Sequence, residues 1–116
     1  MAVLVTKAQR ERLLQNGRRS RDLAAGQDPW PVVKLFTPDA HATWLLAELD
    51  PDDSDLAFGL CDLGNGCPEL GYVRLSELVR IRGRFGLPVE RDRFFEAHGP
   101  ISAYAEVARD KGRIYD

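Results

Sequence analysis

The stretch VKLFTPDAHATWLLAELDPDDSDLAFGLCDLGNGCPELGYVRL, residues 33–75, contains the pattern that most clearly indicates the fold class of this protein. Four runs rich in β-branched, aromatic and aliphatic residues occupy positions 31–36, 42–49, 56–63 and 69–75. Short segments rich in Pro, Asp, Asn and Gly separate these runs, which predicts four strands joined by turns. Both faces of the second run are apolar, as is typical of a central strand. We therefore expect consecutive strands to form an antiparallel meander.

Helices are expected before and after the meander. Thr6 and Gln9 form the capping box of a first helix, and the Asn16-Gly17 pair predicts its end. A last helix would begin at the cap residue Ser102 and stop at Gly112. Because both helices are separate from the strands in the chain, the pattern indicates the α+β class.

A short helix from Ser76 to about Gly83 and a fifth strand over residues 89–96 complete the prediction. The whole chain, residues 1–116, is expected to be one α+β domain with a four- or five-stranded antiparallel sheet and flanking helices. The expected parts are an N-terminal helix and connector (1–31), a sheet core (32–95) and a C-terminal helix (100–116).

Composition places the chain among ordinary globular proteins. It has a mass of 13.0 kDa, with 44% hydrophobic and 29% charged residues, which is enough for one hydrophobic core without disulfides. No apolar run approaches the roughly 20 residues of a membrane helix, and the apolar start at residues 2–5 is too short for a signal peptide. We therefore expect a cytoplasmic protein that contacts no membrane and whose two cysteines are free thiols.

The net charge of −2 conceals an asymmetry along the chain. Residues 1–21 hold six basic residues and one acidic residue, whereas residues 39–77 hold nine acidic residues and one basic residue. A pI near 5.7 argues against dedicated non-specific nucleic-acid binding. The opposed segments can pair with each other or attract partners of opposite charge.

The Gly-Asn-Gly stretch at residues 64–66 is interpreted as a hairpin turn. It lacks the glycine spacing of a dinucleotide loop and the Gly-Lys-Ser/Thr of a P-loop, and a strand follows it. Asn65 and Gly66 both tolerate positive φ, so we expect them to form a primed turn. Five residues separate Cys61 from Cys67, more than the roughly two to four of a typical zinc pair, so no zinc site is expected.

Acidic residues at the expected strand ends permit a hypothesis of metal-dependent catalysis. Asp39, Glu48, Asp50 and Glu69 could converge on Mg²⁺, as the carboxylates of nucleases do. Without such convergence these residues would only hold turns and protect sheet edges. The acidic run at residues 50–55 lacks the Gly and Glu of a calcium loop. We favour a protein with no catalytic site and no cofactor, and we expect Mg²⁺ only under the nuclease alternative.

Arginines next to an aromatic residue indicate a candidate surface for a partner. In RIRGRFG, residues 80–86, the arginines could bind phosphates while the phenylalanine stacks on a base. Basic residues of the first helix could extend this surface, and a tyrosine in the fourth strand could offer its hydroxyl group. The candidates are Arg18, Arg19, Arg21, Arg80, Arg82, Arg84, Phe85 and Tyr72. Nucleic acid would contact these arginines and avoid the acidic meander, which repels phosphates.

Residues 32–95 resemble a family of small bacterial proteins of unknown function that are often encoded on plasmids, integrative conjugative elements and prophages. The resemblance is carried by F-T-P-D at 36–39, Trp44, F-G-L at 58–60, E-L-G-Y at 69–72, S-E-L at 76–78, G-L-P at 86–88 and E-R-D at 90–92. It implies no established activity. Some relatives carry an automated label of single-stranded-DNA endonuclease, which is a lead for the nuclease alternative.

The residues and the resemblance together favour a small non-catalytic interaction module of mobile genetic elements that binds a protein or nucleic-acid partner. An anti-defence role would suit the genetic setting that the resemblance implies. The alternative is a metal-dependent endonuclease that acts on single-stranded DNA.

Overall fold

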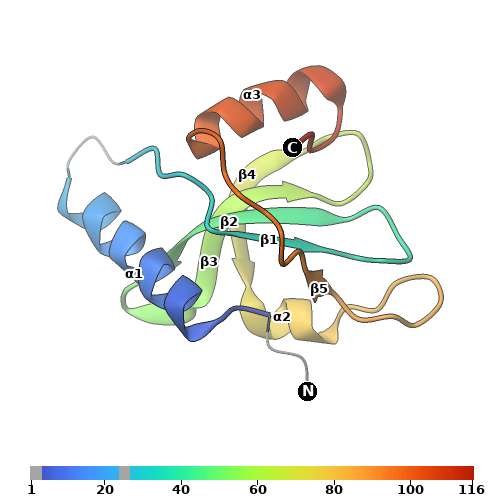
Figure 1. Ribbon diagram of the computed structural model, residues 1–116, viewed down its shortest axis with the longest axis horizontal. Helices are drawn as coiled ribbons and strands as arrows, with labels where there is room; N and C mark the ends of the chain where they lie inside the picture. The colour runs from blue at the N-terminus through green and yellow to red at the C-terminus, as the bar shows by residue number, and fades with distance from the viewer. Residues whose placement is uncertain (1–3, 24–26) are drawn as a thin grey trace.

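One antiparallel sheet of five strands organises the protein (Figure 1). The computed structural model describes residues 4–23 and 27–116. The strands are β1 (Val33–Phe36), β2 (Thr43–Asp50), β3 (Asp53–Asp62), β4 (Glu69–Arg74) and β5 (Glu90–Arg91). Their order across the sheet is β4-β3-β2-β1-β5. The prediction of an α+β fold with an antiparallel meander is confirmed, and β2 occupies the centre of the sheet.

The fifth strand is shorter than the sequence predicts. β5 pairs with only two residues of β1. Directly after it, the side chain of Asp92 accepts a hydrogen bond of 2.9 Å from the backbone N–H of Phe94. Such an Asx turn redirects the chain away from the sheet. The predicted strand over residues 89–96 is therefore wrong beyond Arg91.

The loop between β3 and β4 is wider than a primed two-residue turn. Gly64 and Gly66 have φ values of +80° and +82°, whereas no residue other than glycine has positive φ in the part of the chain that the structure describes. Asn65 instead accepts a hydrogen bond of 3.1 Å from the backbone N–H of Cys67 through its side chain. The predicted hairpin is present, but the primed turn at Asn65 and Gly66 is wrong, because this side-chain bond forms an Asx turn at Asn65 in its place.

The N-terminal helix α1 (Lys7–Asp22) continues past the Asn-Gly pair that predicts its end. Its start is as predicted, because the capping box at Thr6 is present. Asn16 donates a side-chain hydrogen bond of 2.9 Å to the carbonyl oxygen of Ala47 in β2, and Gly17 is buried against the same strand. The pair therefore fastens α1 to the sheet and does not end the helix.

The other two helices follow β4 and the long segment after β5. α2 (Leu75–Arg80) begins directly at the end of β4 and stops before the predicted Gly83. α3 (Ile101–Lys111) ends at the predicted Gly112, which adopts the left-handed conformation with φ +74°. No helix among the described residues has the length and the apolar composition needed to cross a membrane.

The two serines that predict helix starts bind distant aspartates. Ser76 donates from its backbone N–H and its hydroxyl group to Asp55, at 2.9 and 2.7 Å. Ser102 donates in the same way to Asp28. Neither serine is the N-cap of its helix. Both join a helix to a segment far away in the chain.

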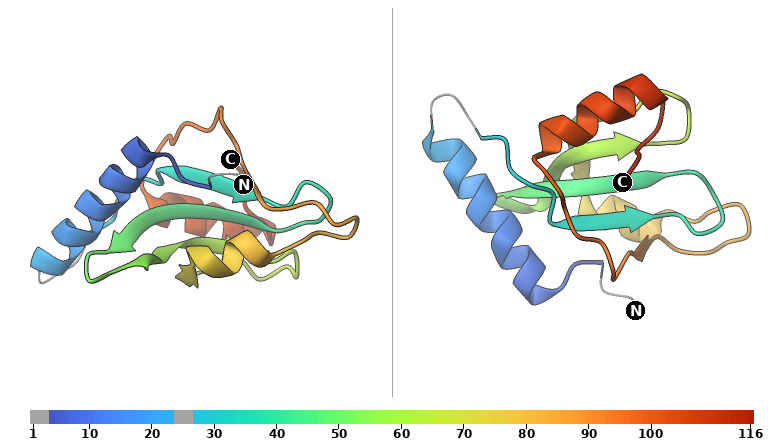
Figure 2. Two further views of the ribbon diagram at one scale, coloured as in Figure 1. Left: turned by 90° about the horizontal axis from the view of Figure 1, so that it is seen from below. Right: turned by 45° about the horizontal axis from the view of Figure 1, so that its top comes forward.

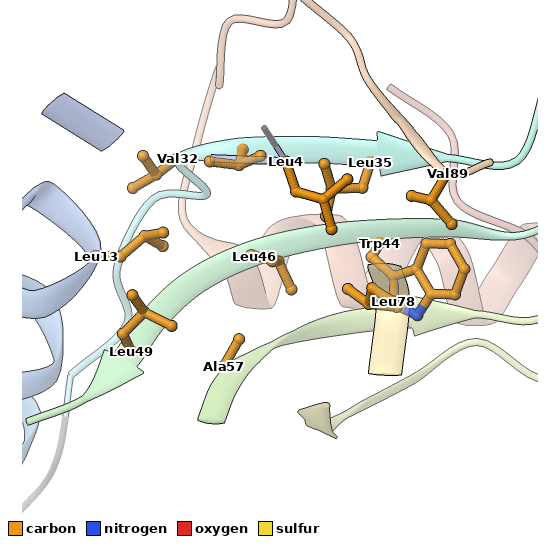
Figure 3. Close-up of a cluster of buried hydrophobic side chains, with 11 residues drawn as sticks. Leu4, Leu13, Val32, Leu35, Trp44, Leu46, Leu49, Ala57, Leu78 and Val89 are labelled. Carbon is orange, nitrogen blue, oxygen red and sulfur yellow. The ribbon is translucent and has the colours of Figure 1, made fainter. Parts of the chain in front are cut away.

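Each face of the sheet carries its own hydrophobic cluster. The first cluster joins the sheet to α1 and α2, and its members include Leu13, Trp44, Leu46, Leu49 and Leu78 (Figure 3). The second cluster joins the sheet to α3 and consists of Leu45, Ala47, Leu60, Ile101, Tyr104, Ala105 and Ala108. Figure 2 shows that α1 crosses the end of the sheet at which β2 stops.

A β-bulge in β2 changes the direction of Glu48. Leu46 pairs with Gly59 and Glu48 pairs with Phe58, so Ala47 is an extra residue in this strand. In a regular strand Glu48 would share the face of Leu46, where the first cluster lies. With the bulge it lies beside Phe58, on the face that α3 covers. The bulge therefore keeps a carboxylate out of the first cluster.

Candidate functional site

The four carboxylates of the nuclease hypothesis lie at two opposite ends of the sheet. Glu48 and Asp50 are at the end of β2, whereas Asp39 precedes its start. Glu69 begins β4 and pairs with Cys61, near the end of β3, so it lies on the side of Asp39. The length of β2 puts roughly 20 Å between the two pairs. In the described part of the chain no group of three or more His, Cys, Asp or Glu side chains could hold a metal ion. The structure does not bring these four residues together.

Asp39 fastens the loop that follows α2 to the turn between β1 and β2. Its Oδ2 accepts hydrogen bonds from the backbone N–H groups of Phe85, at 2.6 Å, and Leu87, at 3.3 Å. A Cβ at Gly83 would overlap the Asp39 carboxylate, so this approach requires glycine. The Asp39 side chain therefore acts as the anchor of the loop at residues 83–87.

The arginines of α1 lie at the end of the sheet where β2 stops. Arg21 forms ion pairs with Asp50, at 3.4 Å, and Asp52, at 2.7 Å. Arg18 and Arg19 are exposed on the same helix. The guanidinium of Arg21 is thus already paired with carboxylates at the turn between β2 and β3.

The arginines of RIRGRFG lie at the other end of the sheet (Figure 1). Arg80 is exposed at the end of α2, and Arg82 donates hydrogen bonds to the backbone carbonyl groups of Val79 and Ile81. The guanidinium of Arg84 lies 5.8 Å from the centre of the Phe85 ring, and Phe85 is 79% exposed. The two arginine groups of the sequence prediction therefore do not form one surface.

Part of the acidic meander is neutralised within the chain. Arg74 forms ion pairs with Asp53, at 2.9 Å, and Asp55, at 3.7 Å. The hydroxyl of Ser76 and then Arg74 hold the pKa of Asp55 below its ordinary value. All of these groups are exposed, so each pair contributes little to stability.

A groove of about 860 Å³ opens beside β1 and β5. We call it the β5 groove. Its walls also include the turn between β1 and β2, the loop after β3 and the segment that follows α3. The residues that matter for its chemistry are Lys34, His41, Asp62, Arg93, Phe94 and Arg113.

The charged groups on the floor of the β5 groove have partners within the protein. The Nζ of Lys34 lies 2.8 Å from Asp116 and 3.6 Å from Asp92. Asp62 is only 4% exposed, and its Oδ2 accepts a hydrogen bond of 2.9 Å from the backbone N–H of Ile114. These contacts hold the segment after α3 against the sheet.

The rim of the β5 groove presents side chains to the solvent. Phe94 is 93% exposed, and Arg93 and Arg113 are exposed as well. None of these three residues is among the candidates named from the sequence. For two of them the sequence holds a signal, because the dipeptide Arg93-Phe94 repeats the dipeptide Arg84-Phe85.

A second pocket of about 220 Å³ lies between α1 and the sheet, and we call it the α1 pocket. Four candidate residues of the sequence line it, namely Arg21, Glu48, Asp50 and Tyr72. Glu48 accepts a hydrogen bond of 2.8 Å from the hydroxyl of Ser20. Burial raises the pKa of Glu48, and the bond from Ser20 partly opposes this effect.

Cys61 and Cys67 are free thiols, as the sequence predicts. Cys61 is partly buried beside the first cluster, and burial raises its pKa. Cys67 is exposed in the loop between β3 and β4.

A family model described as "Protein of unknown function (DUF2958)" matches residues 4–115. The chain belongs to the DUF2958 family. This match confirms the predicted resemblance to a family of unknown function and extends it beyond residues 32–95, so that it includes α1, α3 and both hollows of this DUF2958 protein. A search of the curated proteins finds no match, and neither does a search of the solved structures.

Proposed function

We propose that this DUF2958 protein is a non-catalytic module that binds single-stranded nucleic acid along the β5 groove. The observation that carries the proposal is that two exposed Arg-Phe pairs, Arg84-Phe85 and Arg93-Phe94, flank β5, one before it and one after it. A single strand offers phosphates to arginine and unstacked bases to aromatic rings. An exposed phenylalanine beside an arginine suits this combination.

The contact at Asp39 supports a continuous surface across both pairs. Asp39 binds the backbone of Phe85, and the residues that follow Asp39 in the same turn, Ala40 and His41, line the β5 groove. Phe94 lies on the rim of that groove, and Arg113 reaches it from the segment after α3. Arg93, Phe94 and Arg113 therefore border the groove itself, and Asp39 holds the loop of Arg84 and Phe85 next to the turn that forms one of its walls.

Ion pairing favours this surface over Arg21 of α1. Arg21 is paired with two aspartates, whereas Arg93 and Arg84 have no carboxylate within ion-pair distance among the described residues. Because the overall pI is acidic, we expect few phosphate contacts and a modest salt dependence, with much of the affinity coming from stacking. A role on mobile genetic elements, including anti-defence, is the wider setting of this proposal and rests on the family resemblance. No observation favours the metal-dependent endonuclease.

The test is fluorescence anisotropy with short single- and double-stranded probes at several salt concentrations. The double variant Arg93→Ala/Arg113→Ala should weaken binding and lower the slope of log affinity against log salt, by about 0.7 for each phosphate that the variant no longer neutralises. Phe94→Ala should weaken binding by about fivefold to a hundredfold with an unchanged slope, because stacking on a base releases no counterions.

The matched control is Arg18→Ala/Arg19→Ala, which removes two exposed arginines at the other end of the sheet and should change neither quantity. Absence of binding by the wild type at low salt would overturn the proposal, as would loss of binding in the control alone. An arm with Mg²⁺ or Mn²⁺, with and without chelator, tests the alternative. Metal-dependent cleavage of the single strand would show that the protein is an endonuclease, and the proposal of a non-catalytic binding module would be rejected.

A further inference from the structure

We propose that the α1 pocket is a second, independent binding site that takes a cationic group, the guanidinium or ammonium group of a ligand. It is lined by Glu48, Phe58 and Tyr72 on the sheet side and by Gly17 and Ser20 on the α1 side. The site lies at the end of the sheet opposite to the β5 groove, so it does not depend on nucleic-acid binding there.

The fold places the carboxylate of Glu48 in this pocket through the bulge in β2. The extra residue Ala47 turns Glu48 from the first cluster to the face of Phe58. Bulges of this kind commonly re-aim a side chain beside a functional site. Gly17 lines the same pocket and, because it has no side chain, lets α1 approach the carbonyl of Leu49 next to Glu48.

The charges of the α1 pocket leave one anion without a cation. Asp50 is engaged by Arg21 and by the backbone N–H of Asp52. Glu48 has the hydroxyl of Ser20 as a partner, and no lysine or arginine in the described ranges forms an ion pair with it. A partly buried carboxylate without a counter-charge is costly to the fold. A cation that enters the pocket would offset this cost.

Two aromatic rings border this carboxylate. Glu48, Phe58 and Tyr72 are directly paired across β2, β3 and β4, so their side chains form one row on the α3 face. The rings of Phe58 and Tyr72 are tilted by 57°, with their centres 5.1 Å apart. Tyr72 is 68% exposed, which leaves much of its ring to the solvent. Aromatic faces beside a carboxylate are the usual chemistry of cation recognition.

The size of the pocket selects a small group. About 220 Å³ accommodates one side chain or a small amine, and it is below the roughly 300 Å³ at which pockets for drug-sized ligands begin. An anion would be repelled by Glu48, and an apolar group would leave the carboxylate desolvated and unpaired. The fitting ligands are therefore a basic side chain of a partner protein or a free small amine.

The binding test is an NMR titration of the intact protein, followed at the side chains of Glu48 and Tyr72. The probes are methylguanidinium, ethylammonium and an acetylated, amidated tripeptide with a central arginine, at constant ionic strength. We expect saturable shifts at both residues and a fall in the pKa of Glu48 on binding, because a bound cation favours the ionised carboxylate. Binding should be stronger at neutral pH than in acid, where Glu48 is protonated.

Matched variants assign the site. Glu48→Gln should abolish binding while its spectrum stays that of a folded protein, and Phe58→Leu should weaken binding by roughly twofold to fivefold. Glu69→Gln removes an exposed carboxylate at the other end of the sheet and should leave binding unchanged. Unsaturable shifts, or equal shifts in Glu48→Gln, would overturn the proposal.

The probes also distinguish the two sources of the cation. A tripeptide that binds at least about tenfold more tightly than methylguanidinium indicates a basic side chain of a partner protein, because the extra backbone contacts add affinity. Equal affinities indicate a free small amine. Both results support a cation site, and no binding by any probe excludes it.

Discussion

Gly17 of α1 lies directly against the backbone carbonyl of Leu49 in β2, so closely that a Cβ at residue 17 would overlap the carbonyl oxygen. The neighbouring Asn16 donates its side-chain hydrogen bond to Ala47 in the same strand. The Asn-Gly pair, which in sequence resembles a helix end, is therefore the point at which α1 meets the sheet. Close packing against β2 accounts for a glycine at position 17. An unusual backbone conformation does not, since Gly17 lies within a regular helix.

We expect Gly17→Ala to destabilise the protein by about 1–3 kcal/mol, because the added methyl group forces α1 away from β2. In an isolated helix the same change would stabilise the helix by about 1 kcal/mol. The sign of the change in the free energy of unfolding therefore distinguishes the close contact from helix propensity. Urea denaturation measures it. Gly71→Ala is the control, since a Cβ at Gly71 meets nothing within 4 Å. A more stable Gly17→Ala would contradict the close contact.

Gly66→Val should cost on the order of 1 kcal/mol or more, because Gly66 has φ +82° and a β-branched residue resists this conformation. The cost is conformational, since a Cβ at this position meets nothing within 4 Å. Gly71→Val is the matched control: it has equal space but no positive φ, and it lies in β4, where valine is favoured. Thermal melting should show a lower Tm for Gly66→Val only. Equal Tm values for both variants would count against this explanation.

Asp39→Ala should release the loop at residues 83–87 without unfolding the sheet. The carboxylate accepts the N–H groups of Phe85 and Leu87, and removal of this anchor exposes both groups to solvent. We expect faster hydrogen exchange at these two amides, with unchanged exchange in β2 and β3. Glu69→Ala, at an exposed carboxylate, serves as the control. Unchanged protection of Phe85 would show that Asp39 does not hold the loop.

The two cysteines should react with a thiol reagent at different rates. Cys67 is exposed, whereas Cys61 is partly buried and burial raises its pKa, which lowers the fraction of reactive thiolate. A colorimetric thiol assay on the native protein should give a fast and a slow phase of equal size. Cys67→Ser should remove the fast phase and change the free energy of unfolding by no more than about 0.5 kcal/mol. An absence of free thiols in the non-reduced protein would contradict the assignment.

Glu48→Gln should raise the Tm at neutral pH. The folded pKa of Glu48 lies above its ordinary value of 4.5. As the pH rises through 4.5, the unfolded chain ionises this carboxyl group first, and the native state loses stability until the pH passes the folded pKa. Glutamine does not ionise, so the variant escapes this loss and the difference in Tm should vanish below pH 4.5. An equal Tm difference at both pH values would mean that ionisation is not its cause.

Much of the candidate site could not be predicted because it depends on residues far apart in the chain. Asp39 binds the backbone of Phe85 across 46 residues, and Ser20 binds Glu48 across 28 residues. Tyr72, Glu48 and Asp50 are recognisable as candidates from the sequence, yet only the structure shows that these three share a pocket without Asp39 and Glu69. The bulge at Ala47 also interrupts the alternation of side chains between the two faces of β2. Regular alternation would therefore predict the wrong face for Glu48.

Local sequence patterns are sufficient to predict the strands β1 to β4, the central position of β2, the capping box at Thr6 and the helix stop at Gly112. These features follow from alternation, caps and glycine conformations, which act over a few neighbouring residues. Which cations and rings share a surface depends on contacts between distant segments, because sheet pairing and the bulge set the directions of those side chains. The partners of charged groups at turns and helix ends cannot be predicted from neighbouring residues, since water or many different side chains can satisfy these groups.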